Sequence, residues 1–369
     1  MLQKLHIKGF KGFRDFQLTD ISRVTLVGGK NNIGKTSLLE AIFLFYDRAN
    51  PGMFFRHLGW RGIDIPLTDA ESLFSPIFTD FNMENTISFK VNDGIYEAKM
   101  QIKFEPSLAQ KDVSVDVSSF GNTGTPLQTD TLTAISYYMN IHYEVSGVGQ
   151  EDVAIVLRKT PTNVNIQFKP HPVSIIPGGM MQKAIFFPLR LQVNPGEEAA
   201  RFSELDVVRK VDRVVEFLKI IEPHLVGLTA VTPLPQSPAI YADIQGMSRK
   251  IPVALLGDGM SKLLSVILAI ATANNGIVLI DEIDAGIHYS VLSKVWEGIF
   301  KAAKDFNCQV VATTHNYECL QAASNAASQA GAEDDFSYVR LQIHENNIIA
   351  KQYTHSVLGA ALEQGWEVR

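Results

Sequence analysis

The sequence has little cysteine and no long uninterrupted apolar run. Only two cysteines, Cys308 and Cys319, occur among its 369 residues. This scarcity excludes a disulfide framework and favours a reducing compartment, so we expect a cytoplasmic protein. The longest apolar stretch, from Leu263 to Ile280, is interrupted by Thr272, Asn274, Asn275 and Gly276. It therefore predicts a buried helix, a turn and a buried strand, not a membrane span.

An excess of positive charge is also absent. The chain has 33 Lys and Arg against 39 Asp and Glu, a net charge of −6. That balance argues against a surface coated with nucleic acid, although a local basic groove is compatible with it. No secretory leader is expected, because residues 1–6 lead directly into a strand pattern. No internal repeat and no heptad run long enough for a coiled-coil arm occurs.

Hydrophobic periodicity predicts α/β structure at both ends of the chain and β structure in the middle. The predicted strands are residues 2–8, 13–18, 24–27, 240–244, 251–255, 277–280, 309–313, 338–343 and 348–353. The predicted helices are residues 35–46, 198–228, 260–273, 289–304 and 357–364. Alternating apolar residues from 86 to 173 indicate an antiparallel arm. Because helices and strands alternate in the C-terminal part, we expect a parallel sheet covered by helices.

The strongest chemical signal is a glycine loop between a buried strand and a helix. Gly29-Lys30-Asn31-Asn32-Ile33-Gly34-Lys35-Thr36 matches the G-x4-G-K-T pattern of a phosphate-binding loop, Walker A. Glycine lets the backbone curve so that several N–H groups point at an anion, and asparagine tolerates the required backbone angles. The loop therefore predicts an ATP site, whose nucleotide-binding residues would be Gly29, Asn31, Asn32, Gly34, Lys35, Thr36 and Ser37.

Two residues of this loop have a specific predicted role. Lys35 would place its charge on the β and γ phosphates, and the hydroxyl of Thr36 would bind Mg²⁺. A second part of the magnesium site is predicted where the strand 277–280 ends in Asp281 and Glu282. Asp281 would hold Mg²⁺ directly or through water, and Glu282 would polarise the attacking water. His315, after the strand 309–313, could donate a hydrogen bond to the γ-phosphate.

These motifs, in this order, resemble the ABC-type ATPases of the RecF/SMC/OLD-like branch, also called AAA-type ABC ATPase domains. Residues 30–42 are similar to the Walker A segment of that branch. Leu255–Met260 stands where the ABC signature belongs, and Asp284–His288 is similar to the D-loop region. The resemblance covers the first 50 residues and residues 240–320, and it says little about the β-rich middle.

The resemblance implies an α/β fold: a P-loop ABC-type head with an inserted β-rich arm and a helical lobe, without a long coiled coil. We expect the head to comprise residues 1–90 and 236–369, the arm residues 91–195 and the helical lobe residues 196–235. It also implies a nucleotide held between two heads of a homodimer or higher homo-oligomer. Gly257, Asp258 and Gly259 of one head would then cap the γ-phosphate bound by the other.

The sequence departs from this family in its signature. Gly257 replaces the usual signature serine and Asp258 adds a negative charge, which favours slow hydrolysis. Gln192 is the candidate for the Q-loop. Lys11 and Arg14 follow the first strand, where relatives place a basic nucleotide contact, but we expect both to be solvated surface charges.

Three other functions of related ATPases fit this sequence poorly. A transporter ATPase has its Walker motifs much closer together than Lys35 and Asp281, and an SMC protein needs coiled-coil arms. The chain also contains no Asp-x-Asp element after His315 for the nuclease domain of OLD proteins. We therefore expect an ATP-hydrolysing switch, with ATP and Mg²⁺, that controls a separate nuclease or toxin in bacterial anti-phage defence. The alternative is a RecF-like DNA-repair ATPase, which would bind nucleic acid.

Overall fold

The centre of the molecule is a six-stranded sheet with strand order β16-β15-β3-β14-β13-β9. The computed structural model describes residues 1–48, 59, 70–107, 135–159, 164–170, 183–189, 195–234 and 237–368. Strands β15, β3, β14, β13 and β9 are parallel, and β16 is antiparallel at the edge. The strands are β3 (Val24–Gly28), β9 (Ala184–Phe187), β13 (Ile277–Ile280), β14 (Gln309–Thr313), β15 (Phe336–His344) and β16 (Asn347–Thr354).

Alternate side chains of the central strands enter two different cores. Every residue of β3, β13 and β14 is buried, as parallel strands covered on both faces require. Val24 and Leu26 of β3 pack into one core, whereas Val27 packs into the other. The first core includes helices α6 (Asp258–Thr272), α7 (Tyr289–Asp305), α8 (Tyr317–Gln329) and α9 (His355–Glu363), and the second includes α1 (Lys35–Tyr46).

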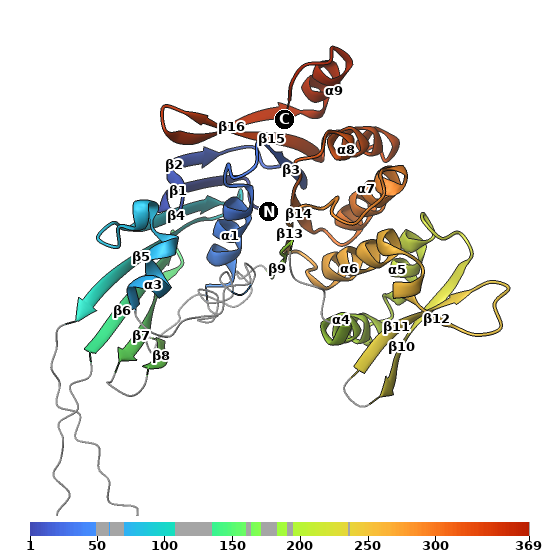
Figure 1. Cartoon of the computed structure of the whole chain (residues 1–369), viewed down its shortest axis with the longest axis horizontal. Helices are drawn as coiled ribbons and strands as arrows, with labels where there is room; N and C mark the ends of the chain where they lie inside the picture. The colour runs from blue at the N-terminus through green and yellow to red at the C-terminus, as the bar shows by residue number, and fades with distance from the viewer. Residues whose placement is uncertain are drawn as a thin grey trace, which may run out of the picture.

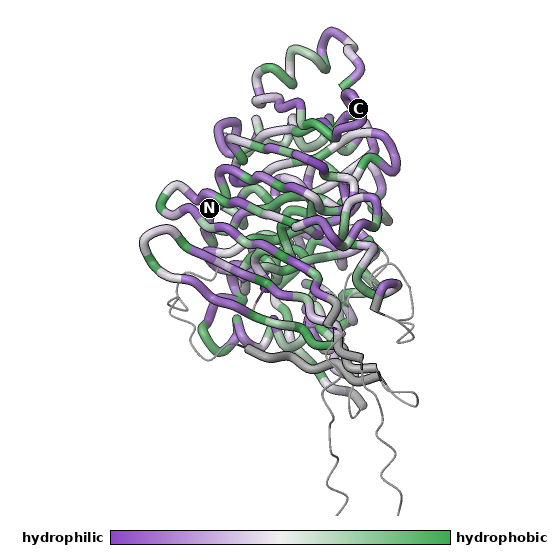
Figure 2. The backbone as a smooth tube through the Cα atoms, turned by 90° about the vertical axis from the view of Figure 1, so that its left-hand side faces the viewer, coloured by the Kyte–Doolittle hydropathy of each residue, from purple (hydrophilic) through white to green (hydrophobic). Residues whose placement is uncertain are grey.

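A seven-stranded antiparallel sheet lies on the α1 side, so that α1 stands between the two sheets (Figure 1). Hydrophilic and hydrophobic residues alternate along its strands (Figure 2), which is typical of a sheet with one buried face. Its order is β2-β1-β4-β5-β6-β7-β8. The strands are β1 (Lys4–Phe10), β2 (Phe13–Leu18), β4 (Ile87–Asn92), β5 (Glu97–Ser107), β6 (Ile135–Val145), β7 (Gly149–Lys159) and β8 (Val164–Pro170).

The antiparallel arm is therefore continuous with the N-terminal hairpin. Strand β4 pairs with β1 from Lys4↔Asn92 to Lys8↔Ser88, and it runs across the expected boundary between residues 90 and 91. Short helical segments precede it: α3 (Ala70–Phe74), η1 (Ser75–Ile77) and η2 (Thr79–Phe81). The strand-like residues 113–117 of the sequence pattern lie outside the described residues.

The expected helical lobe contains two helices and then a strand. Helix α4 (Pro195–Val207) and helix α5 (Val211–Leu218) are followed by a small antiparallel sheet of β10 (Leu225–Leu234), β11 (Ser237–Ile244) and β12 (Ile251–Pro252), and then by η4 (Val253–Leu255). The prediction that helix continues to residue 228 is wrong. Pro223 lacks a backbone N–H and disfavours helical angles in the residue before it, so the helix cannot reach Leu225.

In the C-terminal part of the head, the predicted strand 251–255 is only partly correct, because β12 ends at Pro252 and Val253–Leu255 forms η4. Strands 277–280 and 309–313 occur with the predicted bounds, and helices α6 and α7 begin and end within two residues of theirs. The mixed α/β fold class is likewise confirmed. Among the described residues, no helix is both long enough and apolar enough to span a membrane.

Gly28, the last residue of β3, makes a close approach that a larger residue would block. A Cβ at this position would overlap the hydroxyl and ring of the buried Tyr338, whose Oη donates to the carbonyl oxygen of Val368 at 2.7 Å. We expect Gly28→Ala to destabilise the protein by about 1–3 kcal/mol through overpacking. Thermal unfolding measures this effect. Gly227→Ala in β10 is the matched control, because a Cβ there meets nothing within 4 Å; equal melting temperatures for the two variants would contradict the prediction.

Candidate functional site

The glycine loop connects β3 to α1 and is curved by residues in the left-handed region. Gly29 has φ 135°, Asn32 has φ 61° and Gly34, the N-cap of α1, has φ 104°. A Cβ on Gly29 would lie 2.7 Å from the carbonyl oxygen of Leu341, so only glycine fits at this position. Asn31 and Asn32 are exposed on the loop, and Ser37 is half-buried in the first turn of α1. The loop thus has the curvature that the sequence predicted.

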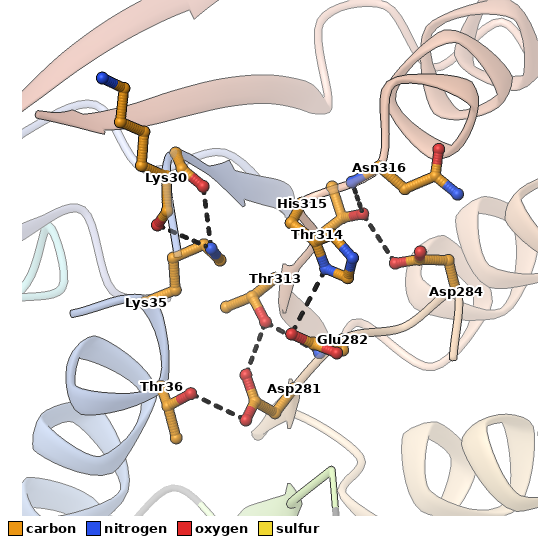
Figure 3. Close-up of polar contacts among 11 residues, drawn as sticks. Lys30, Lys35, Thr36, Asp281, Glu282, Asp284, Thr313, Thr314, His315 and Asn316 are labelled. Carbon is orange, nitrogen blue, oxygen red and sulfur yellow. Dashed lines mark hydrogen bonds and ion pairs between the residues drawn. The ribbon is translucent and has the colours of Figure 1, made fainter. Parts of the chain in front are cut away.

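Lys35 lies inside this loop. Its side chain is 7% exposed, and its Nζ donates to the carbonyl oxygens of Gly29 at 2.8 Å and Lys30 at 3.1 Å. Burial lowers the pKa of Lys35, and the nearby carboxylates of Glu282, Asp281 and Asp284 oppose that shift. The Lys30 side chain points away from this ammonium group (Figure 3). Lys35 is therefore a buried cation in contact with the loop's backbone.

The loop helix is joined to the carboxylate pair through Asp281. Thr36 Oγ1 donates to Asp281 Oδ2 at 2.9 Å, and Thr313 Oγ1 donates to Asp281 Oδ1 at 2.7 Å. Asp281 follows β13, and its side chain is 5% exposed. A hydroxyl and a carboxylate oxygen in direct contact match the hard oxygen donors that Mg²⁺ takes beside a phosphate chain. The residues present therefore fit the magnesium ion that the sequence implied.

Glu282 and His315 lie side by side at the same edge of the sheet (Figure 3). Glu282 Oε1 is 3.3 Å from His315 Nδ1, and their side chains are 25% and 48% exposed. Glu282 has φ 45°, and its backbone N–H donates to Thr313 Oγ1 at 2.8 Å. The structure thus brings Lys35, Thr36, Asp281, Glu282 and His315 to the carboxyl ends of the adjacent strands β3, β14 and β13, where open α/β sheets bind ligands.

Sequence reasoning did not predict two threonine contacts at the end of β14. Thr313 contacts the Walker B carboxylate, and Thr314 Oγ1 donates to Asp284 Oδ1 at 2.7 Å. Thr314 also accepts from the backbone N–H of Asn316, which caps α8. The only available signal was a pair of hydroxyl residues between a buried strand and a histidine.

The signature residues occupy the N-terminus of α6. Gly257 is its N-cap with φ 101°, Asp258 is its first residue, and both are exposed. Gly259 approaches Val291 of α7, since a Cβ there would lie 3.2 Å from Val291 Cγ2. Among the described residues, the hydrogen bonds of the Lys35 and Thr36 side chains stay within the loop and reach Asp281, and do not extend to this segment of the same chain. A shared site would need a second copy.

The two basic residues after β1 behave differently. Lys11 has φ 47° in the turn, and its Nζ forms an ion pair with Glu40 of α1, their side chains being 12% and 3% exposed. The prediction of a solvated charge is therefore wrong for Lys11, because the turn directs its side chain over α1. Arg14 pairs with Asp80 on the surface, where their side chains are 50% and 61% exposed. Gln192 lies outside the described residues.

These features define a P-loop protein: a buried parallel strand, a glycine loop that opens a helix, and a carboxylate at the end of the strand two places along the sheet. Residues 24–320 match the family described as "AAA domain, putative AbiEii toxin, Type IV TA system", and the chain belongs to it. It is an ATPase of the AAA/ABC type.

The chain is also similar to several individual proteins. Over 351 residues the chain is 23% identical to an ATP/GTP phosphatase of Helicobacter pylori, covering 92% of this chain and 90% of that protein. It is 27% identical over 128 residues to the protein MJECL10 of Methanocaldococcus jannaschii, covering 33% of this chain and 56% of that protein. A solved SMC head bound to the C-winged helix domain of ScpA has a TM-score of 0.46 at 13% identity, covering 98% of this chain and 99% of that one.

Two lysines of the loop allow a matched test of nucleotide binding. Lys35 is buried inside the loop, whereas Lys30 is exposed and points away. We expect Lys35→Ala to weaken binding of a fluorescent ATP analogue by roughly 10- to 100-fold, since a hydrogen bond to a charged group contributes about 1.5–3 kcal/mol. Lys30→Ala should bind almost as wild type does. Titration with Mg²⁺ present gives the Kd, and equal losses in both variants would contradict the assignment.

Proposed function

We propose that the chain is an ATP-hydrolysing switch whose two heads close on ATP and so control a separate nuclease or toxin in bacterial anti-phage defence. The observation that carries the proposal is the meeting of Lys35, Asp281 and Glu282 at one edge of the sheet. The name of the Helicobacter pylori relative, an ATP/GTP phosphatase, supports hydrolysis of a nucleoside triphosphate. The family description, which names a toxin and a toxin–antitoxin system, supports the link to defence.

In this proposal the loop residues bind and orient the phosphates. The N–H groups of the loop and of the first turn of α1 face the anion, and Lys35 exchanges its two carbonyl contacts for phosphate oxygens. Thr36 and Asp281 would hold Mg²⁺, which when bound neutralises charge on the phosphates. Gly29 and Gly34 keep the backbone close to the nucleotide.

Glu282 is the proposed general base. Its carboxylate is partly exposed at the mouth of the site, and its backbone is fixed by Thr313. In this position it can accept a hydrogen bond from the water that attacks the γ-phosphate, which gives ADP and phosphate. His315, 3.3 Å from Glu282, can donate to the same phosphate and so respond to its presence.

The second head supplies the cap. Gly257, Asp258 and Gly259 stand at the exposed N-terminus of a 15-residue helix, whose unpaired N–H groups favour an anion. We propose that this end of α6 covers the γ-phosphate bound by the partner copy. Closure of two such heads is the event that an effector protein would detect, and hydrolysis would reopen the pair.

Glu282→Gln tests the base and the closure together. Glutamine keeps the shape of the side chain but cannot accept a proton, so phosphate release should fall by roughly 10²- to 10⁴-fold. ATP and Mg²⁺ should then hold the variant as paired heads, whereas wild type returns to single heads as ATP is consumed. Particle mass with and without ATP, beside phosphate release, gives both results.

The control for this experiment is Glu318→Gln, which alters an exposed carboxylate at the start of α8. It should leave both measurements unchanged. The proposal fails if Glu282→Gln hydrolyses ATP normally and particle mass never responds to ATP.

The effector part of the proposal is tested in cells. A strain expressing the chain with the protein encoded beside it should restrict phage plating, and Lys35→Ala should abolish this protection because ATP no longer closes the heads. Lys30→Ala, in the same loop, should protect as wild type does. Protection that survives Lys35→Ala, or that needs no second protein, would contradict control of a separate effector.

A further inference from the structure

Thr313 makes two contacts with the Walker B pair through one hydroxyl group. It is the last residue of β14 and its side chain is fully buried. Thr313 Oγ1 donates to Asp281 Oδ1 at 2.7 Å and accepts from the backbone N–H of Glu282 at 2.8 Å. A hydroxyl has one proton to donate and lone pairs to accept with, so the two contacts are compatible and use different parts of the group.

The first contact fixes the orientation of the Asp281 carboxylate. With Oδ1 held by Thr313, the other oxygen, Oδ2, faces Thr36 Oγ1 at 2.9 Å. Asp281 is 5% exposed, and a buried polar group is costly unless it finds hydrogen-bond partners. Thr313 therefore supplies a donor on the side away from Thr36, which leaves Oδ2 turned toward the loop helix.

The second contact holds the backbone of Glu282 in an unusual conformation. Glu282 has φ 45°, a left-handed angle that costs about 1–2 kcal/mol for a residue other than glycine. Its N–H is anchored by the Thr313 hydroxyl, and the next N–H, of Ile283, donates to the Thr313 carbonyl oxygen at 3.0 Å. This turn directs the Glu282 side chain to the position beside His315.

We infer that Thr313 is a positioning residue for ATP hydrolysis, which sets the Asp281 carboxylate and the Glu282 backbone at the same time. The inference rests on the proposed roles of those two residues. Thr313 acts through its hydroxyl and does not itself contact the nucleotide. A valine, which has the same shape without the hydroxyl, would leave Asp281 Oδ1 and the Glu282 N–H without this partner.

The test compares Thr313→Val with Thr313→Ser, which keeps the hydroxyl. We expect Thr313→Val to lower kcat by about 10- to 100-fold, the usual effect of losing an outer partner of a metal ligand. It should raise the Mg²⁺ concentration needed for half-maximal activity, while the Kd of a fluorescent ATP analogue is retained. Thr313→Ser should recover most of kcat and the magnesium dependence of wild type.

Thr25→Val controls for placing valine in the buried sheet. Thr25 is fully buried in the neighbouring strand β3, and its hydroxyl contacts Ser22 and Ser337, not the site.

The inference is overturned if Thr313→Val keeps wild-type kcat, or if kcat and melting temperature fall together and serine restores neither. If wild type hydrolyses ATP, Glu282→Gln does not, and Thr313→Val resembles wild type, only the inference fails. If Glu282→Gln hydrolyses ATP normally and particle mass never responds to ATP, the proposed function fails and the inference with it.

Discussion

The carboxylate of Asp281, held between the hydroxyls of Thr36 and Thr313, joins the three elements on which the site depends. Thr36 belongs to α1, Asp281 follows β13, and Thr313 ends β14. Because this carboxylate is almost fully buried, losing either hydroxyl would leave an acceptor without a partner, which is costly in a protein interior. The glycine loop, the proposed metal ligand Asp281 and the proposed base Glu282 are therefore positioned together.

The layers around α1 explain how that helix is kept in place. It packs between the parallel and the antiparallel sheets, and its apolar side chains share one core with residues from both. Lys11 and Glu40 add an ion pair between the β1–β2 turn and the helix. Since β1 is also paired with β4, the antiparallel arm and the loop helix are parts of one packed unit. We therefore expect a displacement of the arm to shift α1, the helix that follows the glycine loop.

The elements that the sequence predicted well are those with a strong local signal. The runs Ile277–Ile280 and Gln309–Thr313 are short, apolar and followed by polar residues, and the glycine loop has a fixed spacing. The contacts of Thr313 depend instead on the register of β13 against β14. Pairing of Ile280 with Ala312 places Asp281 beside Thr313, and no local pattern contains that register. The same holds for Lys11, whose partner Glu40 is 29 residues away.

Long-range pairing also explains why the predicted end of the lobe helix, residue 228, is wrong. The apolar spacing up to residue 221 is typical of a helix. It does not predict that β10 follows and pairs with β11. Pro223 is the local signal that the helix must end, and the pairing of Leu225 with Ile244 supplies the hydrogen bonds that replace it. Periodicity located the buried face, whereas the partner strand determined the secondary structure.

Residues that stabilise the signature segment in an isolated head can weaken the pairing of two heads. Gly257 has φ 101°, which suits glycine and would strain a serine. Asp258 stands in the first turn of α6, where a carboxylate stabilises the positive end of a helix by about 0.3–1 kcal/mol. The same carboxylate lowers the attraction of that helix end for an anion brought by a second copy. If the end of α6 caps the partner's nucleotide, its own acid competes with the γ-phosphate, and we expect closure to be weak and turnover slow for this electrostatic reason.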